Sequence, residues 1–168
     1  MWKSDGTEQG TVMVKDIRTD GEDPVPYGSM PYDLTAVNGI VFFTADNAVD
    51  GEKLWRSDGT EEGTRMLIWP GNNKGLYARN LTACGGSLFF IRGLKLWKSD
   101  GTEQGTVMVK DIRTGSDSSS PSSLTPGNGM IYFVANRGAD GRELWKSDGT
   151  EQGTVMVKDI RFRCGQRR

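Results

Sequence analysis

The phrase WKSDGTEQGTVMVKDIR occurs three times without a single change, at Trp2–Arg18, Trp97–Arg113 and Trp145–Arg161. A diverged fourth copy, WRSDGTEEGTRMLIWP, covers Trp55–Pro70. The tryptophans that open the four copies are 53, 42 and 48 residues apart. Self-similarity at a period of about 48 residues is the mark of a repeat architecture. We therefore expect one structural unit to recur along most of the chain.

A second phrase alternates with the first, so each unit has two parts. It occurs as LTAVNGIVFFTA from Leu34, LTACGGSLFFI from Leu81 and LTPGNGMIYFVA from Leu124. Both parts look like β-hairpins, because short β-prone runs flank a glycine-containing turn. In the Trp phrase the turn is Asp100-Gly101, where glycine reaches positive φ without a Cβ clash. Each unit is thus predicted to hold four strands.

Polar side chains beside this turn are expected to hold it. The hydroxyls of Ser99 and Thr102 can accept hydrogen bonds from backbone amides of the loop, as serine and threonine often do in turns. The chain lacks any window with a helical apolar period over three turns. The sequence therefore predicts an all-β protein.

The second strand of each Leu-Thr hairpin is apolar on consecutive residues, at Ile40–Phe43, Leu88–Ile91 and Met130–Val134. Successive side chains of a strand point to opposite faces, so these strands are expected to be covered on both sides. Small sheets stacked face to face meet this need, as the blades of a propeller do. Leu96 and Trp97 fit the same packing, with one side chain on each face.

Counting hairpins sets the size of the array. Four hairpins of the Trp type and three of the Leu-Thr type make about 3.5 four-stranded blades. Propellers typically have four to eight blades, so we expect an open or incomplete propeller-like array of antiparallel blades. The predicted organisation is a single repeat domain, 1–168, with a half unit at 1–18, full units at about 33–70, 80–113 and 123–161, and an off-pattern tail at 162–168.

The stretch RELWKSDGTEQGT (Arg142–Thr154) resembles the bacterial ELWxxDGT repeat proteins, and the four copies extend this resemblance over nearly the whole chain. Only this copy has the complete Glu-Leu-Trp, because Lys-Leu-Trp stands at Lys53 and Lys95 and Met-Trp at the start. The resemblance implies a propeller-like fold and an extracellular or cell-surface location. It provides no activity to carry over. Because the chain opens inside a motif and its last copy continues off-pattern as FRCGQRR, we also expect it to be a piece of a longer array.

Several kinds of catalytic chemistry are excluded by residue type. The chain has no histidine, and its two cysteines, Cys84 and Cys164, cannot form a four-thiolate zinc site. No glycine-rich phosphate loop is present. The carboxylates of Asp100 and Glu103 recur in every identical copy, whereas a catalytic site needs different residues that converge once. We therefore expect no enzymatic activity; a piece of a carbohydrate-active propeller enzyme is the alternative.

Two acidic turns are candidates for a calcium site. The stretch ADNAVDGE supplies Asp46, Asp50 and Glu52, and ANRGADGRE supplies Asp140 and Glu143. Carboxylate oxygens around a glycine turn are the ligands that calcium prefers. The spacing differs from that of an EF-hand loop, so ordinary polar turns are the leading interpretation, and no cofactor is expected. Calcium-dependent adhesion is kept as an alternative function.

Charge and hydropathy restrict the partners. The 21 basic and 22 acidic residues nearly balance, which predicts no nucleic-acid binding. No apolar run approaches the roughly 20 residues that span a bilayer, and no signal-peptide pattern opens the chain.

The predicted function is therefore that of a non-enzymatic surface or secreted module, acting as a scaffold or as a platform that binds a protein or a glycan. Trp69 departs from the repeat and is the candidate ligand-binding aromatic; packing against a neighbouring blade is the alternative. Open blade edges are also expected to allow self-association, because unpaired strand edges template further pairing.

Overall fold

The computed structural model describes residues 1–19, 28–68, 77–114, 117–138 and 141–159. These residues contain 14 β-strands and no helix. The all-β prediction is confirmed. All strand pairs are antiparallel, and within each sheet the strands follow one another in chain order.

The strands form three four-stranded blades and one half blade. The half blade consists of β1 (Trp2–Lys3) and β2 (Val12–Met13). The first blade consists of β3 (Tyr32–Val37), β4 (Ile40–Asp46), β5 (Glu52–Ser57) and β6 (Arg65–Met66). The second consists of β7 (Ala78–Cys84), β8 (Ser87–Arg92), β9 (Lys95–Ser99) and β10 (Val107–Lys110). The third consists of β11 (Ser122–Gly127), β12 (Met130–Asn136), β13 (Arg142–Ser147) and β14 (Val155–Lys158).

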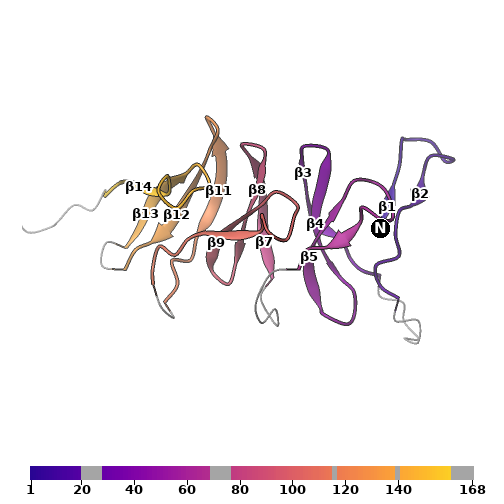
Figure 1. The fold of residues 1–168 in the computed structure, drawn as a ribbon, viewed down its shortest axis with the longest axis horizontal. Coiled ribbons are helices and arrows are strands. Elements are labelled where there is room, and N and C mark those ends of the chain that lie inside the picture. Colours follow the sequence, from indigo (N-terminus) through magenta and orange to yellow (C-terminus); the bar gives the residue numbers. More distant parts are fainter. Residues whose placement is uncertain (20–27, 69–76, 115–116, 139–140, 160–168) are drawn as a thin grey trace, which may run out of the picture.

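The blades stand in a row, in chain order, as Figure 1 shows. None of the four sheets closes on itself, and the described blades do not form a ring. The prediction of an open, propeller-like array of about 3.5 blades is confirmed. The first strands of successive blades, β3, β7 and β11, lie beside one another. Here Thr35 Oγ1 donates to the Leu81 carbonyl at 3.2 Å, and Asn38 Nδ2 donates to the Gly86 carbonyl at 3.0 Å.

Two-residue turns close the Leu-Thr hairpins. Both central residues of each turn have positive φ, at Asn38–Gly39, Gly85–Gly86 and Asn128–Gly129. Turns of this kind match the twist of the flanking strands, which explains the choice of asparagine and glycine. The turn residues thus set the register of β3 on β4 and of the equivalent pairs.

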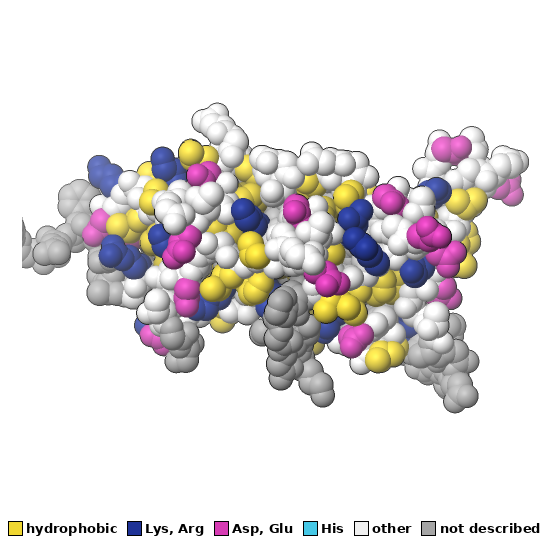
Figure 2. Space-filling view, viewed as in Figure 1, with side chains coloured by type: hydrophobic (Ala, Val, Ile, Leu, Met, Phe, Trp, Pro, Cys, Tyr) yellow, Lys and Arg dark blue, Asp and Glu magenta, His cyan; other side chains and the backbone are white. Residues whose placement is uncertain are grey.

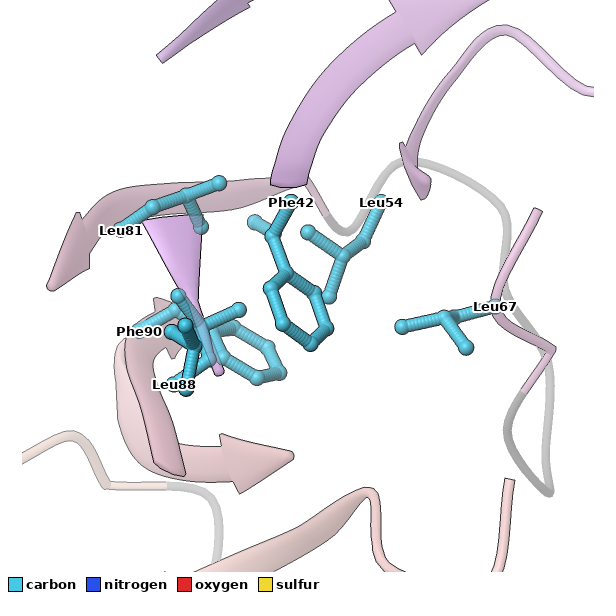
Figure 3. Packing of buried hydrophobic residues seen from close by; sticks show 8 residues of the cluster. Phe42, Leu54, Leu67, Leu81, Leu88 and Phe90 are labelled. Atoms are coloured by element: carbon cyan, nitrogen blue, oxygen red, sulfur yellow. The ribbon is translucent and has the colours of Figure 1, made fainter. Parts of the chain in front are cut away.

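Each blade has a forward face, toward the next blade in the chain, and a backward face, toward the preceding one. Successive side chains of β4 point to opposite faces of the blade. Phe42 is buried in the junction between the first and second blades, together with Leu54. Phe43 is buried on the other side, with Ile17 of the half unit. Figure 3 shows the first of these junctions, where Phe42 points toward Phe90 of the second blade. The two-sided burial predicted for this strand is confirmed.

The second blade shows the same division. Leu96 is buried in the junction with the third blade, near Ile131. Trp97 packs against the junction with the first blade, where its ring stacks on Phe90 with centroids 6.5 Å apart. The prediction that Leu96 and Trp97 point to opposite faces is confirmed.

The third blade differs from the other two. Along β12, Ile131 and Phe133 are buried, but Tyr132 and Val134 between them are only half-buried. The prediction that Met130–Val134 is covered on both sides is therefore wrong. The physical reason is that no described blade packs against the forward face of this sheet.

The exposed fractions of equivalent leucines show how differently the forward faces of the blades are covered. Leu54 and Leu96 are 0% and 1% exposed, whereas Leu144 at the same position of the third blade is 42% exposed. At the other end of the array, the backward face of the half blade is exposed. Trp2 of this face is 64% exposed, whereas the equivalent Trp55 of the first blade is 7% exposed. Among the described residues, the array therefore ends in an exposed backward face at one end and an exposed forward face at the other.

Candidate functional site

The strongest polar cluster of the sequence is the loop that joins the two strands of each Trp hairpin. In the second blade the loop begins with a tight turn. The amide of Gly101 donates to Ser99 Oγ at 3.0 Å, and the amide and hydroxyl of Thr102 both donate to Asp100 Oδ1, at 2.8 and 2.7 Å. The predicted bonding of turn amides to Ser99 is confirmed. Asp100 acts here as the acceptor that fixes the threonine.

The same loop is closed by a second set of bonds. The amide of Gly105 donates to Thr102 Oγ1 at 2.9 Å, which confirms the predicted role of that hydroxyl. Thr106 Oγ1 donates to the Thr102 carbonyl at 2.6 Å and is 2.8 Å from Ser99 Oγ. Each hydroxyl of the motif is thus engaged inside its own loop.

The other three copies repeat these bonds, including the threonine–aspartate pair and the serine–threonine pair that closes the loop. Their loops cover residues 4–11, 57–64 and 147–154. The diverged copy keeps the bonds because it keeps the Ser-Asp-Gly-Thr and Gly-Thr residues that make them. The motif is therefore a structural loop that closes on itself.

The two glycines of the loop are needed for different reasons. Gly101 has a φ of +92°, which favours glycine. Gly105 has no such φ, but a Cβ at this position would lie 2.1 Å from Asp100 Oδ1. The aspartate carboxylate occupies the place of the missing side chain. This packing accounts for the second glycine of the motif.

The motif aspartates are held in their ionised form. The hydroxyl and then the amide of the following threonine donate to the carboxylate, and these bonds lower the pKa of Asp5, Asp58, Asp100 and Asp148. Hydrogen bonds to a carboxylate favour its charged form. The pKa is therefore lowered in all four copies for the same reason, the hydrogen bonds from the following threonine.

Basic side chains join each of the three later loops to the preceding unit. At one position of the motif, Lys3 Nζ donates to the Gly59 carbonyl at 2.8 Å, and Arg56 Nη1 donates to the Gly101 carbonyl at 3.1 Å. Lys98 stands at the same position of the second blade and lies next to Gly149. A cation of one unit thus contacts the turn glycine of the next.

A second lysine position reaches the far end of the same loop. Lys15 Nζ is 2.9 Å from the Thr64 carbonyl, and Lys110 Nζ is 2.9 Å from the Thr154 carbonyl. The same ammonium groups also approach the carbonyls of Glu61 and Glu151, at 3.3 and 3.2 Å. We call these contacts the lysine clamps. Sequence reasoning missed them, although lysine recurs at both positions in all three identical copies.

The junction between the first and second blades lacks the second clamp. Ile68 stands where Lys15 and Lys110 stand in the other copies, and its side chain is exposed. The next residue, Trp69, was the candidate ligand-binding aromatic; it lies outside the described residues.

The first candidate calcium turn is held by bonds within the turn. Asp46 Oδ1 accepts from the Ala48 amide at 2.7 Å, and Asp50 Oδ2 accepts from Asn47 Nδ2 at 2.9 Å. Asp46 Oδ2 is also 3.9 Å from Nη1 of Arg18. These contacts fit the interpretation as an ordinary polar turn.

The other candidate ligands are placed differently. Burial, followed by the influence of the Glu52 carboxylate, raises the pKa of Tyr32. Glu143 is buried on β13, and Asp140 lies outside the described residues. Across the described ranges, no group of three or more aspartate, glutamate or cysteine side chains is arranged to hold a metal ion. The calcium site stays a prediction.

Two further groups that could react, the Asp111 carboxylate and the Cys84 thiol, are paired and buried respectively. Asp111 forms an ion pair with Lys95 of the neighbouring strand. Cys84 is a buried free thiol, and burial raises its pKa. Cys164 lies outside the described residues.

Comparison with known proteins adds no assignment. No family model matches the chain, and no curated protein matches it. Nor do the described segments include a helix long and apolar enough to cross a membrane.

Proposed function

We propose that this protein is a non-enzymatic β-repeat module that acts as a scaffold or as a binding platform for a protein or a glycan. One observation carries the proposal: the serine, aspartate and threonine side chains that recur in every copy form hydrogen bonds within their own loop. A motif used in this way maintains shape. The variable positions between the copies are then left to contact a partner.

The carboxylates support a non-enzymatic role. The motif aspartates lie in equivalent loops of successive units, and each accepts hydrogen bonds from its own threonine. Glycoside hydrolysis commonly needs two carboxylates on either side of one bond, with different roles. Four equivalent, bonded carboxylates on separate loops do not provide that asymmetry.

The turns at one end of the blades offer a contact surface. The β4–β5 turn carries Val49, the β8–β9 turn carries Leu94, and Met30 precedes β3 at the same end of its sheet. All three side chains are exposed. We call this end the turn face. Exposed aliphatic side chains suit a protein partner better than a sugar, since sugars are usually bound on aromatic rings.

The proposed location is the cell surface or the extracellular space. It is supported by the resemblance of the repeat phrase to the ELWxxDGT proteins. The surface of the molecule fits a general platform: in Figure 2, basic and acidic side chains alternate along the array without a large region of one sign.

A binding panel tests this function. The purified chain is immobilised and exposed to cell-surface polysaccharides and isolated surface proteins, and release of reducing sugar is measured on the same polysaccharides. We expect at least one component to be retained without hydrolysis. The V49D/L94D variant should weaken retention, whereas the control V107D, an exposed site beside the Trp-hairpin loop at the opposite end of its blade, should not. Hydrolysis of any polysaccharide, or retention that both variants leave unchanged, contradicts the proposal.

A further inference from the structure

We propose that two copies of this chain associate head to tail. The forward face of the third blade of one copy packs on the backward face of the half blade of another, and two lysines clamp the loop at residues 4–11. The inference uses surfaces other than the turn face and does not depend on the proposed function.

The junctions inside the chain provide the template. In each one, a leucine or methionine of the forward face is covered by the next unit while cations reach the carbonyls of the next loop. Between the second and third blades, Leu96 is buried and Lys110 bonds to the Glu151 and Thr154 carbonyls. A junction therefore joins an apolar forward face that carries one or two carbonyl-binding cations to a backward face with a Ser-Asp-Gly-Thr loop.

The third blade carries the forward half of such a junction. Leu144 and Val157 stand at the positions of Leu96 and Val109, and both are exposed. Lys146 and Lys158 stand at the two cation positions of the motif. Within the described residues neither ammonium group has a hydrogen-bond or ion-pair partner.

The half blade carries the backward half. Trp2 and Met13 stand at the positions of Trp55 and Met66; they are exposed, whereas Trp55 is buried and Met66 is half-buried. The loop at residues 4–11 has the same internal bonds as the loops that are clamped inside the chain.

The acceptors for the two lysines are in place on that loop. The carbonyls of Gly6, Glu8 and Thr11 stand at the positions of the carbonyls that Lys3 and Lys15 contact in the first blade. We assign Lys146 of one copy to Gly6 of the other, and Lys158 to Glu8 and Thr11.

Charge favours this pairing over a symmetric one. Two third blades placed face to face would bring Lys146 and Lys158 against the same lysines of the partner, and like charges in contact are unfavourable. The loop at residues 4–11 instead presents the carboxylates of Asp5 and Glu8. A second copy in head-to-tail orientation is thus the occupant that matches both the apolar and the charged groups.

This contact is heterologous, because the two surfaces are different. Such contacts produce rings when the rotation between copies closes and open chains when it does not. Only the outer half of the third blade, β13 and β14, meets the half blade, since the described half blade consists of β1 and β2. The new junction is therefore smaller than the two full blade junctions and is expected to be reversible.

Sedimentation velocity on two complementary variants tests the proposal. The tail variant is L144D/K146E/K158E and the head variant is W2D/M13D; all five positions are half-buried or exposed at the ends of the array, and circular dichroism verifies that each variant folds. The wild-type mass is expected to rise over about a hundredfold range of concentration, by mass action. Each variant alone should stay monomeric.

An equimolar mixture of the two variants distinguishes the orientation. The head variant keeps a normal tail and the tail variant keeps a normal head, so one junction can form and the mixture should produce dimers but nothing larger. V49D, on the turn face, should associate like the wild type. A monomeric wild type throughout the range overturns the proposal. So does association of either variant alone, which would indicate edge pairing or a symmetric contact, or a mixture that stays monomeric.

Discussion

The space that a side chain would occupy at Gly105 accounts for much of the repeated motif. Asp100 fills that place with its carboxylate, and the same carboxylate anchors Thr102. The sequence predicted the turn at Asp100-Gly101 and the bonding of the neighbouring hydroxyls, because these follow from local turn chemistry. It could not predict the role of Gly105, since the constraint comes from an atom five residues away in a folded loop.

Alanine at Gly105 tests this packing. The G105A variant must displace the Asp100 carboxylate, so we expect its free energy of unfolding to fall by about 1–3 kcal/mol, in the range of disrupted polar loops. Gly28→Ala is the control, because a Cβ added there would meet no atom within 4 Å and the backbone of Gly28 does not have a positive φ. Urea denaturation of both variants measures the difference. An unchanged midpoint for G105A contradicts the account.

Acid should weaken the loops through the same carboxylates. The pKa values of Asp5, Asp58, Asp100 and Asp148 are lowered in the folded protein by bonds from threonine. A carboxylate whose pKa is lower in the folded than in the unfolded chain stabilises the fold at any pH above its unfolded pKa of about 3.9. This stabilisation is lost as the pH falls through the folded pKa. We therefore expect the melting temperature to drop below about pH 4.

A set of asparagine variants isolates this effect. Asparagine at the four motif aspartates removes the titrating groups, so the quadruple variant should melt lower at pH 7 and show a flatter pH dependence below pH 4 (about the unfolded pKa). Thermal scans followed by circular dichroism provide the comparison. A variant whose acid profile matches that of the wild type would show that other carboxylates dominate.

At the scale of elements, the four-stranded blade could be predicted because its hairpins are local. Turn residues and consecutive apolar positions defined β3–β4 and β7–β8 within the sequence itself. The failure at β12 has a non-local cause: Tyr132 is apolar enough for a covered face, but no described blade covers it. The lysine clamps were missed for the same reason, because Lys110 meets Thr154 only after the blades stack.

Removal of one clamp should weaken the junction that it joins. In K110M the Glu151 and Thr154 carbonyls lose the hydrogen bonds from the ammonium group, and we expect the free energy of unfolding to fall by about 1 kcal/mol. Lys158→Met is the matched control at the equivalent position of the third blade, where the described structure provides no partner. Equal effects in urea denaturation, at a concentration where the chain is monomeric, would show that the clamp does not stabilise the junction.

Insertion of the missing clamp should have the opposite effect. Ile68→Lys places an ammonium group where Lys15 and Lys110 stand, within reach of the Glu103 and Thr106 carbonyls by analogy with those junctions. It also replaces an exposed apolar side chain. We expect a gain of up to about 1 kcal/mol. The control is Ile68→Gln, which is polar but carries no charge; a gain as large in the control would exclude the clamp as its cause.

At the scale of the whole molecule, stability comes from two full blade junctions and the smaller junction of the half blade. Each buries apolar side chains from both of its partners. The sequence predicted the open array by counting hairpins. It could not show which faces are bare, because identical phrases occupy covered and uncovered positions. Trp2 and Trp145 belong to the same phrase, yet one is exposed and the other buried.

The same leucine position in three blades provides the most direct test of this open, stacked array. Leu54, Leu96 and Leu144 are equivalent in sequence but are 0%, 1% and 42% exposed. The alanine variants are compared by urea denaturation at a concentration where the chain is monomeric. The account predicts losses of about 2–5 kcal/mol for L54A and L96A, because each leaves a cavity in a junction. It predicts a loss below about 1 kcal/mol for L144A. Equal losses at all three positions would contradict it, since the forward face of the third blade would then be as covered as the others.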